Sequence, residues 1–145
     1  MRKPATDVLG DGFSTLRKEF LSSSNAALTN YALDDYPVFC IPAAQATAAE
    51  PGSFGIVIGG SGNGEQMAAN KVKGVRAALV WSLETAKLAR EHNNANVISV
   101  GGRLHSIEDC QSFIDTFLAT PFSGDERHIR RINQMSNFET TGKIK

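Results

Sequence analysis

Residues 59–64 read Gly-Gly-Ser-Gly-Asn-Gly, so four glycines fall within six positions. Glycine loses more backbone entropy on folding than other residues, so this stretch indicates positive φ angles or a ligand that approaches the backbone closely. The preceding residues, 54–58, form a short apolar run typical of a strand buried on both faces of a parallel sheet. A strand, a glycine-rich turn and a helix start together predict an anion-binding concavity, because backbone N–H groups and the helix dipole point into it.

The chain from residue 37 onward alternates helical and strand patterns joined by short loops. This alternation predicts a doubly wound (Rossmann-like) α/β fold, in which helices cover both faces of one parallel sheet. Ligands of such folds bind beyond the carboxyl ends of the strands, where the glycine-rich loop and residues 101–103 are expected. The expected strands are 54–58, 75–81 and 96–100, and the expected helices are 37–50, 65–71, 82–92, 106–118 and 124–138.

The first thirty residues do not continue this pattern. They contain one modest amphipathic segment, 13–21, then a Ser/Asn-rich stretch, and no convincing strand. We therefore expect a single domain over 32–139, preceded by an atypical segment 1–31 that is disordered or loosely helical and followed by a short tail 140–145.

Composition argues against several classes of protein. Lys+Arg 15 and Asp+Glu 15 give a formal net charge of zero, which does not suit a nucleic-acid-binding chain. No apolar run approaches the roughly 18 residues of a membrane span, and the N-terminus lacks the apolar core of a signal peptide. Cys40 and Cys110 have no metal-ligand spacing and are expected to be buried thiols. We expect a cytoplasmic protein without a metal site.

Known phosphate-binding and nucleophile motifs fit the glycine-rich loop poorly. The P-loop requires a Lys followed by Ser or Thr, and the dinucleotide fingerprint G-x-G-x-x-G is replaced here by G-x-G-x-G. The serine-hydrolase elbow G-x-S-x-G fails because Asn63 stands at its last glycine. A nucleotide-binding module is therefore a weak alternative.

Glu65 follows the loop in the first turn of the expected helix. A carboxylate there often does no more than interact favourably with the helix dipole. Beside converging N–H donors it can also remove a proton from a carbon next to a carbonyl, while the donors stabilise the oxyanion. Ser61 can donate one more hydrogen bond. This pairing of a base with an anion hole suits enediolate chemistry, which needs no cofactor.

Two further polar positions lie near expected helix or strand ends. His92 and Asn93 end a helix, and both residue types commonly terminate helices without another role. His92 also titrates near neutral pH and can transfer protons at a sugar oxygen. Arg103 follows the glycine pair that closes a strand, a usual position for a ligand contact.

The last helix carries basic residues four positions apart. Arg127 and Arg131 share one of its faces, and Ile129, Ile132 and Met135 are expected on its buried face. The two arginines form either a solvated basic face or a fork that binds a phosphate dianion. His128 and Arg130 point elsewhere on the helix and are not included in the expected site.

Three stretches, "GGSGNGEQMAANKVKGVRAAL", "AREHNNANVISVGGR" and "ERHIRRI", resemble the type B ribose-5-phosphate isomerases, in the branch that uses Glu as its base. The wider family includes the galactose-6-phosphate isomerase subunits, and the resemblance runs from about residue 32 to about residue 138. It implies a doubly wound α/β fold and a homodimer with active sites shared between subunits. It also implies interconversion of ribose 5-phosphate and ribulose 5-phosphate through an enediolate, in the pentose phosphate pathway, without metal or coenzyme.

The resemblance assigns roles to the candidate residues. Glu65 is similar to the base that moves a proton between C1 and C2, His92 to the histidine that assists ring opening, and Asn93 to its substrate-binding neighbour. Gly59 stands where another branch carries a catalytic cysteine, which leaves Glu65 as the base. Ser61 is expected to act with Glu65 and His92 in catalysis. The residues similar to the anion hole are Gly60, Ser61, Gly62, Asn63 and Gly64. The residues similar to the phosphate-binding arginines are Arg103, Arg127 and Arg131.

The N-terminus departs from the family pattern. Family members begin with an internal strand that ends in Gly-x-Asp-His-x-Gly, whose Asp takes part in ring opening, and residues 1–31 contain neither. Without that strand, backbone groups of its neighbours would stay unpaired. Either the N-terminus is an altered or misassigned reading of the gene, or the chain is a genuine variant with impaired activity or a sheet completed by other residues.

Two functions follow from these observations. The first is a sugar-phosphate isomerase with Glu65 as base, acting on a phosphorylated pentose. The alternative is a non-catalytic phosphosugar-binding or partner subunit that has lost the ring-opening Asp. A six-carbon sugar phosphate is an alternative substrate, because arginines that bind the phosphate do not determine how many carbons the sugar has.

Overall fold

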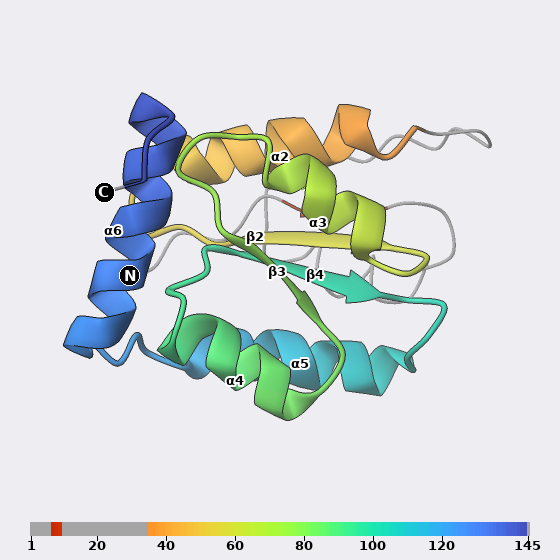
Figure 1. Ribbon diagram of the computed structural model, residues 1–145. Helices are drawn as coiled ribbons and strands as arrows, with labels where there is room; N and C mark the ends of the chain where they lie inside the picture. The colour runs from red at the N-terminus through yellow and green to blue at the C-terminus, as the bar shows by residue number, and fades with distance from the viewer. Residues whose placement is uncertain (1–6, 10–34, 145) are drawn as a thin grey trace.

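The computed structural model describes residues 7–9 and 35–144. Its elements are β1 Asp7–Leu9, α2 Pro37–Ala49, β2 Gly55–Gly59, α3 Asn63–Ala69, β3 Ala77–Val80, α4 Leu83–Glu91, β4 Val97–Gly101, α5 Ile107–Ala119 and α6 Glu126–Thr141. The four strands form one parallel sheet with the order β1-β2-β4-β3. Helices α2 and α3 cover one face and α4 and α5 cover the other (Figure 1). The doubly wound α/β fold is confirmed.

The prediction that the first thirty residues contain no strand is wrong. Asp7–Leu9 form β1, which pairs in parallel with β2 and places Leu9 opposite Ile58. A strand of three residues has almost no local signal, and its conformation comes from pairing with the edge of β2. Backbone N–H and C=O groups along this edge of β2 therefore pair with β1, whereas the sequence analysis expected them to stay unpaired. The rest of the segment 1–31, including the amphipathic stretch 13–21, lies outside the described residues.

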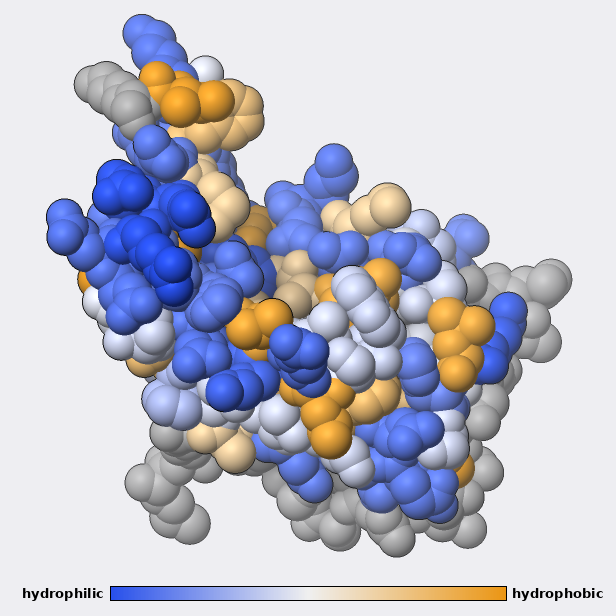
Figure 2. Space-filling view, turned by 60° about the horizontal axis from the view of Figure 1, so that its bottom comes forward, coloured by the Kyte–Doolittle hydropathy of each residue, from blue (hydrophilic) through white to orange (hydrophobic). Residues whose placement is uncertain are grey.

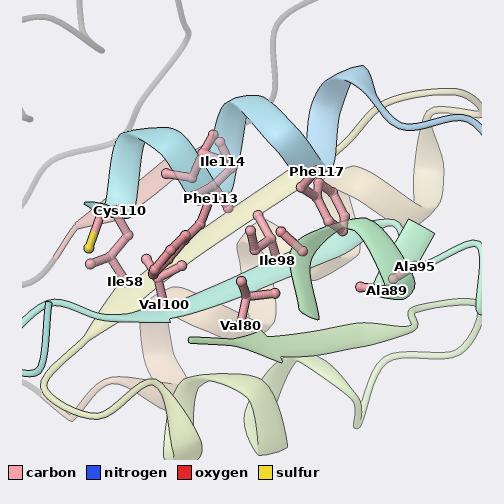
Figure 3. Packing of buried hydrophobic residues seen from close by; sticks show 12 residues of the cluster. Ile58, Val80, Ala89, Ala95, Ile98, Val100, Cys110, Phe113, Ile114 and Phe117 are labelled. Atoms are coloured by element: carbon pink, nitrogen blue, oxygen red, sulfur yellow. The ribbon is translucent and has the colours of Figure 1, made fainter. Parts of the chain in front are cut away.

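The core lies in two layers, because successive residues of a strand face opposite sides of the sheet. Ile56, Ile58, Ile98 and Val100 pack against α4 and α5, where Phe117 is fully buried (Figure 3). On the other face, β-strand residues pack against the small side chains of α2 and α3. The members of this second layer are Cys40, Ala43, Ala44, Val57, Ala68, Ala69, Val75, Ala77 and Val97.

Local signals set where the helices of the second face begin. Ser82 caps α4 through a capping box with Thr85, and Ser106 caps α5 by accepting a hydrogen bond from the Asp109 backbone N–H. Both helices start directly after strands, so they run from the carboxyl ends of the strands back to the amino ends. His92, the C-cap of α4, therefore lies at the amino edge of the sheet.

Helix α6 lies at this amino edge and is the least covered of the described helices (Figure 1). His128 is the buried residue of α6, while Ile129 and Met135 are 42% and 49% exposed. The prediction that these two side chains form a buried face is therefore wrong within this chain. Figure 2 shows the helix projecting at the left, with apolar and hydrophilic side chains both on its surface. Helical spacing predicts which residues share a face, but not whether another element covers that face.

Candidate active site

Strands β2 and β4 lie side by side but lead into helices on opposite faces of the sheet. The loops that follow these two strands therefore run in opposite directions from the carboxyl edge of the sheet. Doubly wound folds bind their ligands at this kind of topological switch point. The two loops are joined by backbone hydrogen bonds, from Gly102 N to the Gly59 oxygen at 2.8 Å and from Arg103 N to the Gly60 oxygen at 3.1 Å. The glycine-rich loop and Arg103 are thus brought together, as the sequence predicted.

The glycine-rich loop lies directly on the end of β4. Gly62 has a φ of 79° and caps α3, a conformation that other residues rarely adopt. The buried Ser99 hydroxyl donates a hydrogen bond of 2.7 Å to the Gly62 oxygen. A side chain at Gly101 would come within 2.7 Å of the Ser61 oxygen. Glycine is needed at these positions for the left-handed turn and for the close approach of two backbones.

Glu65 lies in the first turn of α3 and is only 8% exposed. Its carboxylate lies against Gly59, where any side-chain carbon would overlap it. The Arg103 guanidinium lies beside the next residue, Gly60, and would be 3.1 Å from a side-chain carbon there. A carboxylate and a guanidinium therefore flank two consecutive glycines, which is a suitable arrangement for a base beside an anion site.

Tyr36, the N-cap of α2, and Cys40 of α2 lie close to the site, although sequence reasoning assigned neither a role there. The Tyr36 ring lies against Gly64, and its hydroxyl oxygen would be 2.6 Å from a side-chain carbon at that glycine. Burial, with a further contribution from the Glu65 charge, raises the pKa of the Cys40 thiol to about 12. Cys40 therefore stays protonated at neutral pH, and its burial confirms the prediction that it is a buried thiol. The local sequence identifies Tyr36 only as a helix start.

The other predicted residues gather at the amino edge of the sheet. The His92 ring stacks against His128, with the ring centroids 4.3 Å apart. Asn93 is exposed, lines a cleft of about 450 Å³ and accepts a hydrogen bond of 3.0 Å from Arg76 Nε through its backbone oxygen. Arg127 and Arg131 lie on α6 at the same edge, and both are exposed. His128 was left out at the sequence level, because position on a helical wheel does not show what a helix packs against.

The two groups of residues are separated by the length of the sheet. β2 has five residues, so a rise of about 3.3 Å per residue places its ends about 13 Å apart. Within one chain the amino-edge side chains therefore do not meet the Glu65 carboxylate. The carboxyl-edge residues are Gly60, Ser61, Gly62, Asn63, Gly64, Glu65 and Arg103, and the amino-edge residues are His92, Asn93, Arg127 and Arg131.

Across residues 7–9 and 35–144, His, Cys, Asp and Glu side chains form no group of three or more that could hold a metal ion. None of the helices described there is both long and apolar enough to cross a membrane.

Sequence comparison agrees with this fold. A family model described as Ribose/Galactose Isomerase matches residues 14–135, a span that begins earlier than the motifs quoted above. The ribose-5-phosphate isomerase B of Mycobacterium leprae (strain TN) is 59% identical over 108 residues, which cover 74% of this chain and 67% of that protein. The chain belongs to the ribose/galactose isomerase family.

Solved structures extend the similarity over nearly the whole chain. The type B ribose 5-phosphate isomerase of Trypanosoma cruzi superposes with a TM-score of 0.86 at 33% identity, covering 99% of this chain and 100% of that chain. The ribose-5-phosphate isomerase B of Mycoplasma genitalium, solved with bound ribulose-5-phosphate, gives a TM-score of 0.85 at 37% identity over 95% of this chain and 97% of that chain.

Proposed function

We propose that this chain is an aldose–ketose isomerase that interconverts ribose 5-phosphate and ribulose 5-phosphate in the pentose phosphate pathway. The observation that carries the proposal is the buried Glu65 carboxylate, which lies against Gly59, next to Gly60 and the Arg103 guanidinium beside it. Relatives named ribose-5-phosphate isomerase B support the choice of a pentose. The free, buried Cys40 and Cys110 suit a reducing compartment, and we place the reaction in the cytoplasm.

The chemistry needs one base and one anion site. Glu65 removes the proton from C2 of the open-chain aldose, and the electrons of the C–H bond form a C1–C2 double bond while the carbonyl electrons move to O1. Backbone N–H groups of the loop 60–64, with Ser61, stabilise the negative charge that develops on the oxygen. Return of the proton to C1, together with transfer of the O2 proton to O1, gives the ketose with its C1 hydroxyl. No electrons leave the substrate, so this step needs no redox cofactor.

The amino-edge residues enter this site from a second copy of the chain. The separation of about 13 Å between the sheet edges prevents His92 from acting beside Glu65 of its own chain. In a homodimer with shared sites, His92 and Asn93 assist ring opening and binding, and Arg127 and Arg131 hold the phosphate of a substrate bound at the partner's Glu65. The exposed apolar side chains of α6 supply a surface for such a partner.

Replacing Glu65 tests the proposal. Glu65→Ala should lower kcat by about a hundredfold to ten-thousandfold, the usual contribution of a general base, while leaving affinity for the sugar phosphate largely unchanged. Glu84 is the matched control, because it is also an acidic residue in the first turn of a helix but is exposed on α4. Glu84→Ala should retain wild-type turnover. Near-normal turnover by Glu65→Ala would remove Glu65 from the mechanism.

One observation favours a second function. Residues 1–31 lack the Gly-x-Asp-His-x-Gly motif, so the chain can instead be a phosphosugar-binding subunit that no longer opens the sugar ring. Ribose 5-phosphate would then raise the melting temperature without being converted. Measuring turnover and thermal stabilisation on the same sample, with a six-carbon sugar phosphate alongside, separates these functions and reports the preferred sugar length.

A further inference from the structure

His128 of α6 packs against His92 at the end of α4, and proposed substrate-binding groups lie on α6 and at the end of α4. It is the buried residue of α6, with 4% of its surface exposed. Its ring stacks against that of His92 at the end of α4, with centroids 4.3 Å apart and an interplanar angle of 35°. Arg127 and Arg131 lie on the same helix as His128. The ring contact therefore sets how the arginine-bearing helix is seated against His92.

A short hydrogen-bond network fixes the His128 ring. Its Nδ1 atom lies 3.0 Å from the Ser123 hydroxyl oxygen, and its backbone N–H donates to the Asp125 oxygen at 2.9 Å. The Ser123 backbone N–H in turn donates to the oxygen of Glu91, the residue before His92, at 3.0 Å. The loop that leads into α6 is thus tied to the end of α4 next to the ring contact.

Charges around His128 favour its neutral form. Burial lowers the pKa of His128, and the positive charges of His92, Arg127 and Arg131 lower it further. Asp125, whose carboxylate oxygen is 4.0 Å from Nδ1, acts in the opposite direction. A neutral ring can stay packed against His92 while that residue gains and loses a proton, whereas a second cation at this distance would be repelled.

We propose that His128 is a positioning residue for the isomerase: its ring orients His92 for the opening of the sugar ring. This inference rests on the proposed function. In ring opening, the C1 hydroxyl loses its proton, the bond between C1 and the ring oxygen breaks, and the ring oxygen gains a proton. His92 carries one of these two transfers. Proton removal by Glu65 from an open-chain sugar does not involve His92, so the two steps can be measured separately.

Two substitutions separate the ring contact from the hydrogen bond. His128→Asn keeps a polar atom near the Nδ1 position but removes the ring, and His128→Phe keeps a ring but removes the bond to Ser123. Arg130→Gln is the control, because Arg130 is an exposed neighbour on α6 with no assigned role. The readouts are kcat with ribose 5-phosphate and solvent hydrogen exchange at C1 of ribulose 5-phosphate, a ketose that stays open because its 5-hydroxyl is phosphorylated. Both are measured at saturating substrate.

His128→Asn should lower ribose 5-phosphate turnover by about tenfold to a hundredfold, as expected for a misplaced catalytic group, and change C1 exchange by less than about twofold. His128→Phe should recover part of the loss, and Arg130→Gln should match the wild type. An equal fall in turnover and exchange, or no fall in either, would overturn the proposal.

A second measurement does not depend on activity. The chain has three histidines, so their ring signals can be assigned by NMR with little overlap. His128→Asn should shift the His92 ring protons by removing the stacked ring. His105, which packs edge-on against Phe113, should keep its signals. If the wild type did not convert ribose 5-phosphate, the proposed function would be wrong. An unchanged His92 signal in His128→Asn would overturn the positioning role, whatever the activity of the wild type.

Discussion

The Glu65 carboxylate occupies the space into which any side chain at Gly59 would project. The φ of Gly59 is not positive, so its backbone conformation alone does not require glycine. Residue 59 must lack a side chain because the Glu65 carboxylate lies directly over its Cα. The identity of residue 59 therefore determines where the proposed base can be.

Gly59→Ala tests this relationship. The added methyl group should displace the Glu65 carboxylate by about 1 Å and lower kcat about a hundredfold, with little change in melting temperature. Gly52→Ala should show the reverse pattern, because Gly52 has a φ of 85° and nothing within 4 Å of an added side chain. That variant should lose about 1 kcal/mol of stability and keep its turnover. Unchanged kcat in Gly59→Ala would contradict the assigned position of the base.

The shared site can be tested by mixing inactive variants. Glu65→Ala and His92→Ala homodimers should each be inactive, or nearly so. If each site combines Glu65 of one chain with His92 of the other, a mixed dimer contains one intact site, and random exchange of subunits restores about a quarter of wild-type activity. Activity is measured before and after the two variants are unfolded and refolded together. No recovery, although mixed dimers are detected, would place both residues in the same chain's site.

Most of the fold could be predicted because its signals are local. The short apolar runs and the helical spacings are properties of neighbouring residues, and β2 and β4 lie within one residue of the expected bounds. The site at the carboxyl edge could also be predicted, since the glycine-rich loop and Arg103 each follow a strand, and parallel strands end at the same edge.

The remaining features depend on contacts between distant segments. β1 has three residues and exists through pairing with β2, so its sequence alone gave no signal. The stacking of His128 on His92 depends on how the loop before α6 turns, which helical spacing does not encode. The exposure of Ile129 has the same origin, because a pattern of apolar residues cannot show whether a helix is covered within its own chain.

Ser99 should matter for both stability and turnover. Its buried hydroxyl donates to the Gly62 oxygen at 2.7 Å and holds the glycine-rich loop on β4. Ser99→Ala should lower the free energy of unfolding by about 1 kcal/mol, the usual net value of one hydrogen bond, and lower kcat as the loop loosens. Ser112→Ala is the control, because that serine bonds only to its own helix and is exposed. Equal effects of the two substitutions would mean that the loop does not depend on Ser99.

The buried His128 should make stability depend on pH. Burial and the charges of His92, Arg127 and Arg131 lower the pKa of His128 below its ordinary 6.5, with Asp125 opposing them. As the pH falls below 6.5, the unfolded chain therefore binds a proton that the folded chain resists, and the free energy of unfolding decreases until the folded form is also protonated. Above that pH the contribution is absent. Urea unfolding between about pH 5 and 8 should show a smaller decrease in His128→Phe than in the wild type, because phenylalanine has no proton to bind. An identical pH dependence in the two proteins would show that His128 takes up its proton equally well in the folded and unfolded states.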